Sequence, residues 1–190
     1  MNKLIGRQYE QQQLQKAFDS TEAELIAVYG RRRVGKTYLI RYFFNHKNCI
    51  FFQVSGIHQA PLHSQLKEFK KEVERIFFNE NKSILLKDPE TWMEALGMLT
   101  DAIHVMGARK KIVIFFDEFP WMCTPKSGLL QAFDYYWNRF WVNNPKLKFV
   151  VCGSAASWII EHIINNKGGL HNRVTLRIYL EPFTLFEVKE

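Results

Sequence analysis

The sequence predicts an α/β fold of three layers, in which helices cover both faces of a central parallel sheet. Short apolar segments of the kind that form buried strands alternate along the chain with segments whose apolar residues recur at helical spacing. This alternation is typical of parallel sheets, because a crossover must follow each strand before the next can run in the same direction. The five predicted strands are residues 24–29, 49–54, 111–116, 147–152 and 174–180.

Helices are predicted before and between these strands. Pro61 opens a long amphipathic helix. Asp88-Pro-Glu90 predicts the start of the next helix, since aspartate is a favoured N-cap and proline fits the first turn. Gly107 is the predicted C-terminal cap of that helix. The predicted helices are residues 8–20, 35–44, 61–77, 88–106, 129–142 and 155–165.

Residues 30–37 fit the Walker A pattern G-x-x-x-x-G-K-[ST] of a P-loop NTPase, with a strand before and a helix after. Gly30 and Gly35 allow backbone angles at which consecutive N–H groups turn toward an anion. Lys36 can place its charge against the β- and γ-phosphates, and Thr37 can offer its hydroxyl to Mg²⁺. The predicted nucleotide-binding residues of this loop are Gly30, Arg31, Arg32, Arg33, Val34, Gly35, Lys36, Thr37 and Tyr38.

Asp117 and Glu118 directly follow the apolar strand 111–116, which is typical of a Walker B motif. Asp117 is predicted to hold the Mg²⁺ shell, either through water or through Thr37. Glu118 is predicted to act as the general base toward an attacking water. An acid after a strand is common, but a Walker A motif upstream favours the catalytic interpretation. The second carboxylate also favours hydrolysis, because transfer to a hydroxyl acceptor does not need it there.

Two further residues are candidates for the catalytic site. Ser154 follows the strand 147–152, and it either donates a hydrogen bond to the γ-phosphate or the lytic water, as a sensor 1 residue, or caps the helix 155–165. Arg173 precedes the last strand and is either an arginine finger, in cis or from a neighbouring molecule, or a surface arginine. Arg177 is the second candidate for the finger. The predicted catalytic residues are Lys36, Glu118, Ser154 and Arg173.

Composition excludes several other classes of protein. The 190 residues are 47% hydrophobic, which excludes disorder and is enough for one domain with a substantial core. No apolar run approaches the ~20 residues that span a bilayer, and the N-terminus lacks the apolar core of a signal peptide, so we expect a cytoplasmic protein without a membrane partner. The formal charge of +7 permits a nucleic-acid partner, although part of it lies in the arginines of the Walker loop.

Five segments in this order resemble those of the predicted archaeal and bacterial AAA+ ATPases, a group close to the signal-transduction (STAND) NTPases. The resemblance covers essentially the whole chain. The matching segments are Ile5-Gly-Arg7, Val28-Tyr-Gly-Arg-Arg-Arg-Val-Gly-Lys-Thr37, Phe116-Asp-Glu-Phe-Pro-Trp121, Val151-Cys-Gly-Ser154, and Gly169-Leu-His-Asn-Arg173 through Leu180-Glu-Pro-Phe183.

This resemblance implies an ASCE sheet, in which the sensor 1 strand lies between the Walker A and Walker B strands. It implies that Ile5, Gly6 and Arg7 lie against the adenine, and that Arg173 is the motif arginine. Asn172 stands where many relatives carry glycine. The resemblance also implies that residues 1–190 are the ATPase core alone, without the C-terminal lid and the further domains that relatives carry.

The leading functional hypothesis is a molecular switch that binds ATP with Mg²⁺ and hydrolyses the ATP. One alternative is a kinase that acts on a small molecule or a nucleotide. Another is a non-hydrolysing scaffold or nucleic-acid-binding module whose state is controlled by the bound nucleotide. The expected partners are a protein or a second copy of the chain on the Arg173 side, and nucleic acid through a C-terminal domain outside this sequence.

Overall fold

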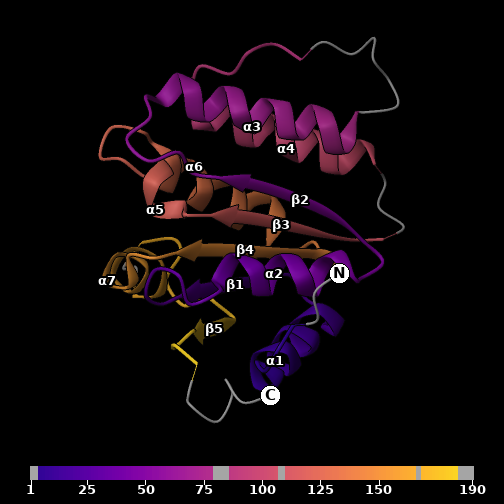
Figure 1. The fold of residues 1–190 in the computed structure, drawn as a ribbon. Helices are drawn as coiled ribbons and strands as arrows, with labels where there is room; N and C mark the ends of the chain where they lie inside the picture. Colours follow the sequence, from indigo (N-terminus) through magenta and orange to yellow (C-terminus); the bar gives the residue numbers. More distant parts are fainter. Residues whose placement is uncertain (1–3, 79–85, 107–109, 166–167, 184–190) are drawn as a thin grey trace.

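The computed structural model describes residues 4–78, 86–106, 110–165 and 168–183, which form a five-stranded sheet in the order β2-β3-β4-β1-β5 (Figure 1). Every neighbouring pair of strands is parallel. The predicted parallel sheet is therefore confirmed, and β4 lies between β1 and β3 as the resemblance implied. The strands are β1 Glu24–Tyr29, β2 Cys49–Ser55, β3 Lys111–Asp117, β4 Leu147–Gly153 and β5 Leu176–Tyr179.

The predicted helices are present, with differences inside two of them. The stretch predicted as one helix over residues 129–142 starts as an α-helix and continues as a π-helix, and so does the stretch 155–165. Both ladders place apolar residues inside, so the sequence pattern does not separate them. The helical elements are α1 Gln8–Asp19, α2 Lys36–Asn45, α3 Leu62–Phe77, α4 Trp92–Val105, α5 Phe119–Met122, α6 Leu129–Tyr136, η1 Trp137–Trp141, α7 Ala156–Ile159 and η2 Ile160–Ile164.

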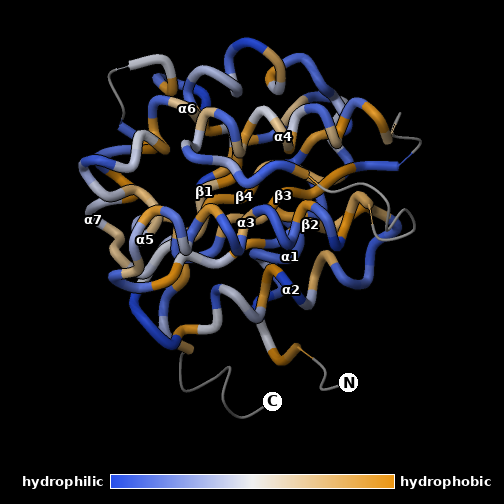
Figure 2. The backbone as a smooth tube through the Cα atoms, turned by 90° about the horizontal axis from the view of Figure 1, so that it is seen from above, coloured by the Kyte–Doolittle hydropathy of each residue, from blue (hydrophilic) through white to orange (hydrophobic). Residues whose placement is uncertain are grey.

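Alternate residues of the central strands build two separate cores, because successive side chains of a strand point to opposite faces. On β3, Ile114 and Phe116 face the core formed with α3, α4 and α6, whereas Val113 and Phe115 face the core formed with α1 and α2. Figure 1 shows α3 and α4 on one side of the sheet and α1 and α2 on the other. In Figure 2 the hydrophobic colour is concentrated on β1, β3 and β4 at the centre of the molecule.

The predicted start of α4 at Asp88-Pro-Glu90 is wrong, because the helix begins at Trp92. Thr91 is the N-cap, and its side chain accepts a hydrogen bond from the Glu94 N–H at 3.2 Å. The Asp88 carboxylate instead accepts a bond from Lys70 of α3 at 2.6 Å. A threonine three residues before a glutamate is the better capping signal here. The Gly107 cap lies outside the described residues.

The strand β5 is shorter than the predicted 174–180, although backbone hydrogen bonds continue beyond both of its ends. Thr175 N–H donates to Leu25 O at 2.9 Å, and Leu180 N–H donates to Tyr29 O at 2.8 Å. The Walker loop therefore starts beside Leu180, at the carboxyl end of the sheet. Among the described residues, no helix is long and apolar enough to cross a membrane.

Lys148 on β4 is a fully buried cation at the amino end of the sheet. Its Nζ donates to the carbonyl oxygens of Ser20 (3.0 Å), Pro145 (3.2 Å) and Glu22. Burial lowers the pKa of Lys148 from 10.5 to about 8. One side chain thus satisfies three carbonyls of the two loops that precede β1 and β4.

We expect Lys148→Met to lower the free energy of unfolding by about 1–3 kcal/mol, because the three carbonyls lose their donor. Between the folded pKa of about 8 and the unfolded value of 10.5 the unfolded chain binds more protons, so the contribution of Lys148 to stability rises with pH. Urea denaturation at about pH 7 and about pH 9.5 should show a wider gap between wild type and variant at the higher pH. A constant gap would contradict this account.

Candidate nucleotide-binding and catalytic site

The predicted site residues of three motifs meet at the carboxyl edge of the sheet. Gly30 follows β1, Asp117 ends β3, and Ser154 follows β4. Because β4 pairs in parallel with both β1 and β3, the three strand ends lie next to one another. Ligands of open α/β sheets bind at this edge.

The Walker loop connects β1 to α2 with two glycines in left-handed or otherwise positive-φ backbone, Gly30 at φ 146° and Gly35 at φ 91°. A Cβ on Gly30 would lie 2.2 Å from the carbonyl oxygen of Leu180, so glycine is required there on grounds of space as well. Lys36 is buried, and its Nζ donates to Gly30 O at 3.0 Å and to Arg31 O at 2.7 Å. The ammonium is therefore held inside the loop that it is expected to serve.

Thr37 and Asp117, which are 80 residues apart in sequence, are in direct contact. The Thr37 hydroxyl lies 2.9 Å and 3.1 Å from the two carboxylate oxygens of Asp117. Burial, together with the charge of Glu118, raises the pKa of Asp117, whereas hydrogen bonds from Thr37 and Cys152 oppose that shift. Burial also raises the pKa of the Cys152 thiol, which therefore stays neutral.

This pair of oxygen donors fits Mg²⁺. Mg²⁺ prefers hard oxygen ligands and is usually held by one or two protein groups together with substrate phosphates. In the described part of the chain, no group of three or more His, Cys, Asp or Glu residues forms a site made by protein alone. Thr37 and Asp117 are thus the residues that would hold the ion beside a bound triphosphate.

Glu118 is held in a specific geometry. Its backbone is left-handed, at φ 47° and ψ 46°, which is uncommon for a residue with a side chain. Its carboxylate oxygen Oε2 accepts hydrogen bonds from the Ser154 backbone N–H at 3.1 Å and from the Ser154 hydroxyl at 3.0 Å. Ser154 does not cap α7, because the N-cap is Ala155. The capping alternative for Ser154 is therefore wrong, and its role toward the γ-phosphate or the lytic water stays a prediction.

Two glycines to which the sequence analysis gave no role make room for Glu118 and the short helix after it. A Cβ on Gly56, which follows β2, would lie 2.6 Å from the Glu118 carbonyl oxygen. A Cβ on Gly153 would lie 2.7 Å from Pro120 Cδ. The available sequence signal was a glycine directly after a strand at the edge where ligands bind.

The remaining side chains of the loop are exposed. Arg31, Arg32 and Arg33 all face solvent. The Arg32 guanidinium lies 5.6 Å from the ring centre of Trp121, on α5. Tyr38 is 47% exposed and stacks on Tyr42 of α2. Their predicted contacts with nucleotide stay predictions.

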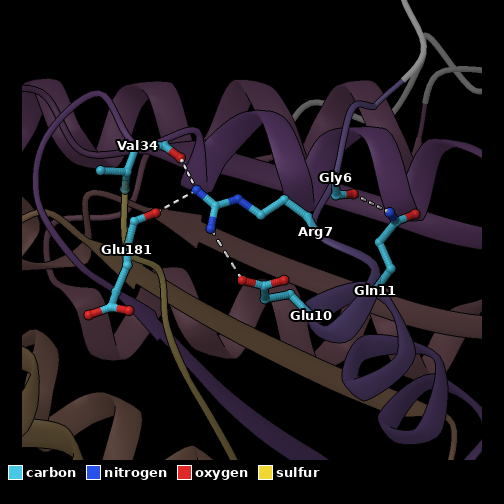
Figure 3. Close-up of polar contacts among 6 residues, drawn as sticks. All are labelled: Gly6, Arg7, Glu10, Gln11, Val34 and Glu181. Atoms are coloured by element: carbon cyan, nitrogen blue, oxygen red, sulfur yellow. Dashed lines mark hydrogen bonds and ion pairs between the residues drawn. The ribbon is translucent and has the colours of Figure 1, made fainter. Parts of the chain in front are cut away.

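Arg7, in the N-terminal segment, contacts the same loop at the carbonyl oxygen of Val34 (Figure 3). Ile5 is 52% exposed, whereas Arg7 is only 5% exposed. The Arg7 guanidinium donates to Val34 O at 3.3 Å and to Glu181 O at 2.5 Å, and it pairs with Glu10 at 3.3 Å. The guanidinium carbon Cζ of Arg7 lies 4.2 Å from the centre of the Phe183 ring, in a cation–π contact. The sequence analysis did not anticipate the contacts with Glu181 and Phe183.

Arg173 is exposed and lies at the other end of the sheet from Lys36 and Glu118. It precedes Thr175, which bonds to Leu25 at the start of β1, whereas the Walker loop follows the end of β1. The span from Leu25 to Gly30 is about 16 Å of extended strand. Asn172 adopts a left-handed backbone at φ 55°, a conformation that asparagine takes more often than most residues with a side chain.

A protein-family profile described as an ATPase domain predominantly from Archaea matches residues 4–189. The chain belongs to this family. A relative along nearly all of this ATPase domain is the uncharacterized protein MJECL04 of Methanocaldococcus jannaschii, which is 26% identical over 188 residues. That alignment covers 98% of the chain and 38% of the relative.

Solved structures of other nucleotide-binding proteins share the fold of this ATPase domain. The Walker-type ATPase PABY2304 of Pyrococcus abyssi aligns at a TM-score of 0.65 and 20% identity, over 97% of this chain and 55% of that chain. The ORC2 protein of Aeropyrum pernix, solved in ADPNP-ADP complexes, aligns at a TM-score of 0.70 and 15% identity, over 98% and 50%. The chain thus spans between 38% and 55% of the length of these proteins.

We expect Gly56→Ala to slow ATP turnover while leaving nucleotide affinity within about twofold, because the new Cβ displaces the Glu118 backbone and not the Walker loop. The loss of rate should be on the order of 10-fold to 100-fold, as for a misplaced catalytic group. The control is Gly97→Ala in α4, whose Cβ meets the end of the Tyr136 side chain away from the site. Unchanged turnover in Gly56→Ala would show that the position of Glu118 is not limiting.

Proposed function

We propose that this AAA+-type domain binds ATP with Mg²⁺, hydrolyses the ATP, and acts as a nucleotide-dependent molecular switch. The observation that carries the proposal is the direct contact between Thr37 of Walker A and Asp117 of Walker B, with Lys36 and Glu118 at the same edge of the sheet. Membership of an ATPase family supports the same reaction.

In the proposed complex, the N–H groups of the Walker loop and the ammonium of Lys36 bind the β- and γ-phosphates. Lys36 exchanges its bonds to Gly30 O and Arg31 O for bonds to phosphate oxygens. When bound, Mg²⁺ supplies positive charge beside the same phosphates, held by Thr37 and Asp117. Ile5, two residues before Arg7 and 52% exposed, offers apolar surface for the base.

In the proposed hydrolysis, Glu118 is the general base for the attacking water. The water oxygen forms a bond to the γ-phosphorus, the bond from that phosphorus to the bridging oxygen breaks, and ADP and phosphate result. Glu118 accepts the proton that the water loses. Ser154 holds the Glu118 carboxylate through two hydrogen bonds and lies where its hydroxyl can turn to the water or the γ-phosphate. A kinase would need an acceptor hydroxyl in place of this water.

The central test is single-turnover hydrolysis at saturating Mg·ATP by wild type and Glu118→Gln. The amide is nearly isosteric and its oxygen still accepts both Ser154 bonds, but it does not take a proton at neutral pH. We expect unchanged binding and a rate roughly 10²–10⁴-fold lower. Lys36→Ala is the control that loses binding instead. Equal rates for wild type and Glu118→Gln would reduce the proposal to nucleotide binding alone.

We also propose that Arg173 acts on the site of a neighbouring copy. Its place at the amino end of the sheet supports this over action within one chain, since the phosphates would lie at the carboxyl end. Such a site is complete only in an assembly, which would couple hydrolysis to partner contacts. In this proposal, further domains outside residues 1–190 would respond to the nucleotide state and would bind nucleic acid accordingly.

A mixing experiment tests Arg173. Arg173→Ala keeps an intact Walker site, and Lys36→Ala keeps an intact Arg173, so each variant lacks what the other supplies. We expect each variant alone to hydrolyse ATP more slowly than wild type, with a rate lower by on the order of 10³-fold or more where the arginine finger is lost. The mixture should regain activity as the protein concentration rises. A mixture no faster than the two variants alone would place Arg173 outside the reaction or within one chain.

A further inference from the structure

The Arg7 side chain makes its polar contacts with other residues of the protein. Its guanidinium is buried and is bonded to Val34 O, Glu181 O and Glu10 (Figure 3). The Phe183 ring also lies against this guanidinium. These partners come from α1, the Walker loop and the segment after β5, which are far apart in sequence. A side chain that is 5% exposed and holds these contacts has little surface left for a base.

The bond to Val34 O sets the orientation of a peptide inside the Walker loop. The peptides of the described residues are all trans, and in a trans peptide the C=O and N–H groups point in opposite directions. Arg7 holds the Val34 carbonyl, so the Gly35 N–H of the same peptide points away from Arg7. That N–H is one of the donors that a Walker loop presents to phosphate.

The segment after β5 is attached to the same loop at two more points. The Leu180 N–H donates to Tyr29 O at 2.8 Å, one residue before the loop. The Leu180 carbonyl oxygen lies so close to Gly30 that a Cβ there would approach to 2.2 Å. Arg7 then links Glu181 O to Val34 O through a single nitrogen, Nη2. These contacts connect the Walker loop and the residue before it to Leu180 and Glu181.

We propose that Arg7 is a positioning residue, which fixes the Val34–Gly35 peptide for phosphate binding and couples the occupied loop to the segment Glu181–Phe183, and that it does not read the base. The proposal rests on nucleotide binding at the Walker loop, as proposed above. It assigns base contact to the neighbouring Ile5 and Gly6 and predicts that loss of Arg7 weakens every polyphosphate equally.

Calorimetry with two ligands separates positioning from base contact. We expect Arg7→Ala to weaken Mg·ATP and Mg·tripolyphosphate, which has no base, by the same factor of about tenfold or more. Arg7→Lys should regain part of the affinity for both, since an ammonium can reach one of the two carbonyls. The matched control is Arg41→Ala on α2, which removes an exposed arginine bonded to Gln53 and should leave both affinities unchanged.

Each outcome decides. Weaker ATP binding with unchanged tripolyphosphate binding would make Arg7 a base contact and overturn the proposal, as would unchanged binding of both. If wild type bound neither ligand, the proposed function itself would fall. If Arg7→Ala does not fold, Phe183→Leu is the substitute variant. The Phe183 side chain is 43% exposed, so we expect the Phe183→Leu protein to fold. It should weaken both ligands about two- to fivefold, the value of an exposed cation–π contact.

Hydrogen exchange tests the coupling. At saturating Mg·ATP we expect slower exchange of the Leu180, Glu181 and Phe183 amides in wild type and in Arg41→Ala than without nucleotide. In Arg7→Ala, with ATP raised until the site is again saturated, this nucleotide-dependent protection should disappear, and Arg7→Lys should restore part of it. Equal protection in wild type and saturated Arg7→Ala would overturn the coupling while leaving the proposed function intact.

Discussion

Parallel pairing of β4 with both β1 and β3 is the constraint on which the site depends. It brings the ends of these three strands to one edge, so that Gly30, Asp117 and Ser154 become neighbours although the chain separates them widely. The two apolar cores on either face keep this central part of the sheet dry and rigid. Rigid strands are a better base for catalytic geometry than loops, because their ends do not move independently.

Close approach of backbone is the second feature of this edge. Gly30 touches Leu180, Gly56 touches the Glu118 carbonyl, and Gly153 touches Pro120, each at a distance that excludes a Cβ. Glu118 itself adopts a strained left-handed backbone and is held there by Ser154. Strain of this kind persists where the surroundings over-determine it, and the strained residue here is the candidate base.

The charges of the site are arranged in a corresponding way. Lys36 is stored against carbonyls of its own loop, and Arg7 holds that loop from outside. Asp117 is buried beside Glu118, and burial raises the pKa of its carboxyl group. A cation beside this carboxylate would favour its charged form. A triphosphate with Mg²⁺ meets both conditions, since it offers anions to Lys36 and a cation to Asp117. Arg173 lies toward the opposite, amino end of the sheet, which is why we propose that it acts on a neighbouring molecule.

The sequence alone was enough to predict the fold class, the position of the Walker loop and the position of Asp117 and Glu118 at the end of a strand. This was possible because strand periodicity and a loop that needs two glycines are local properties of the chain. The prediction misplaced the start of α4, where threonine capping at Thr91 and the Lys70–Asp88 pair override the Asp-Pro signal. Only the tertiary structure decided that Ser154 holds Glu118, that Gly56 must be small, and that Arg7 joins Val34 to Glu181. Those contacts join residues between 27 and 174 positions apart, and no local pattern specifies which distant backbone atom a side chain will meet.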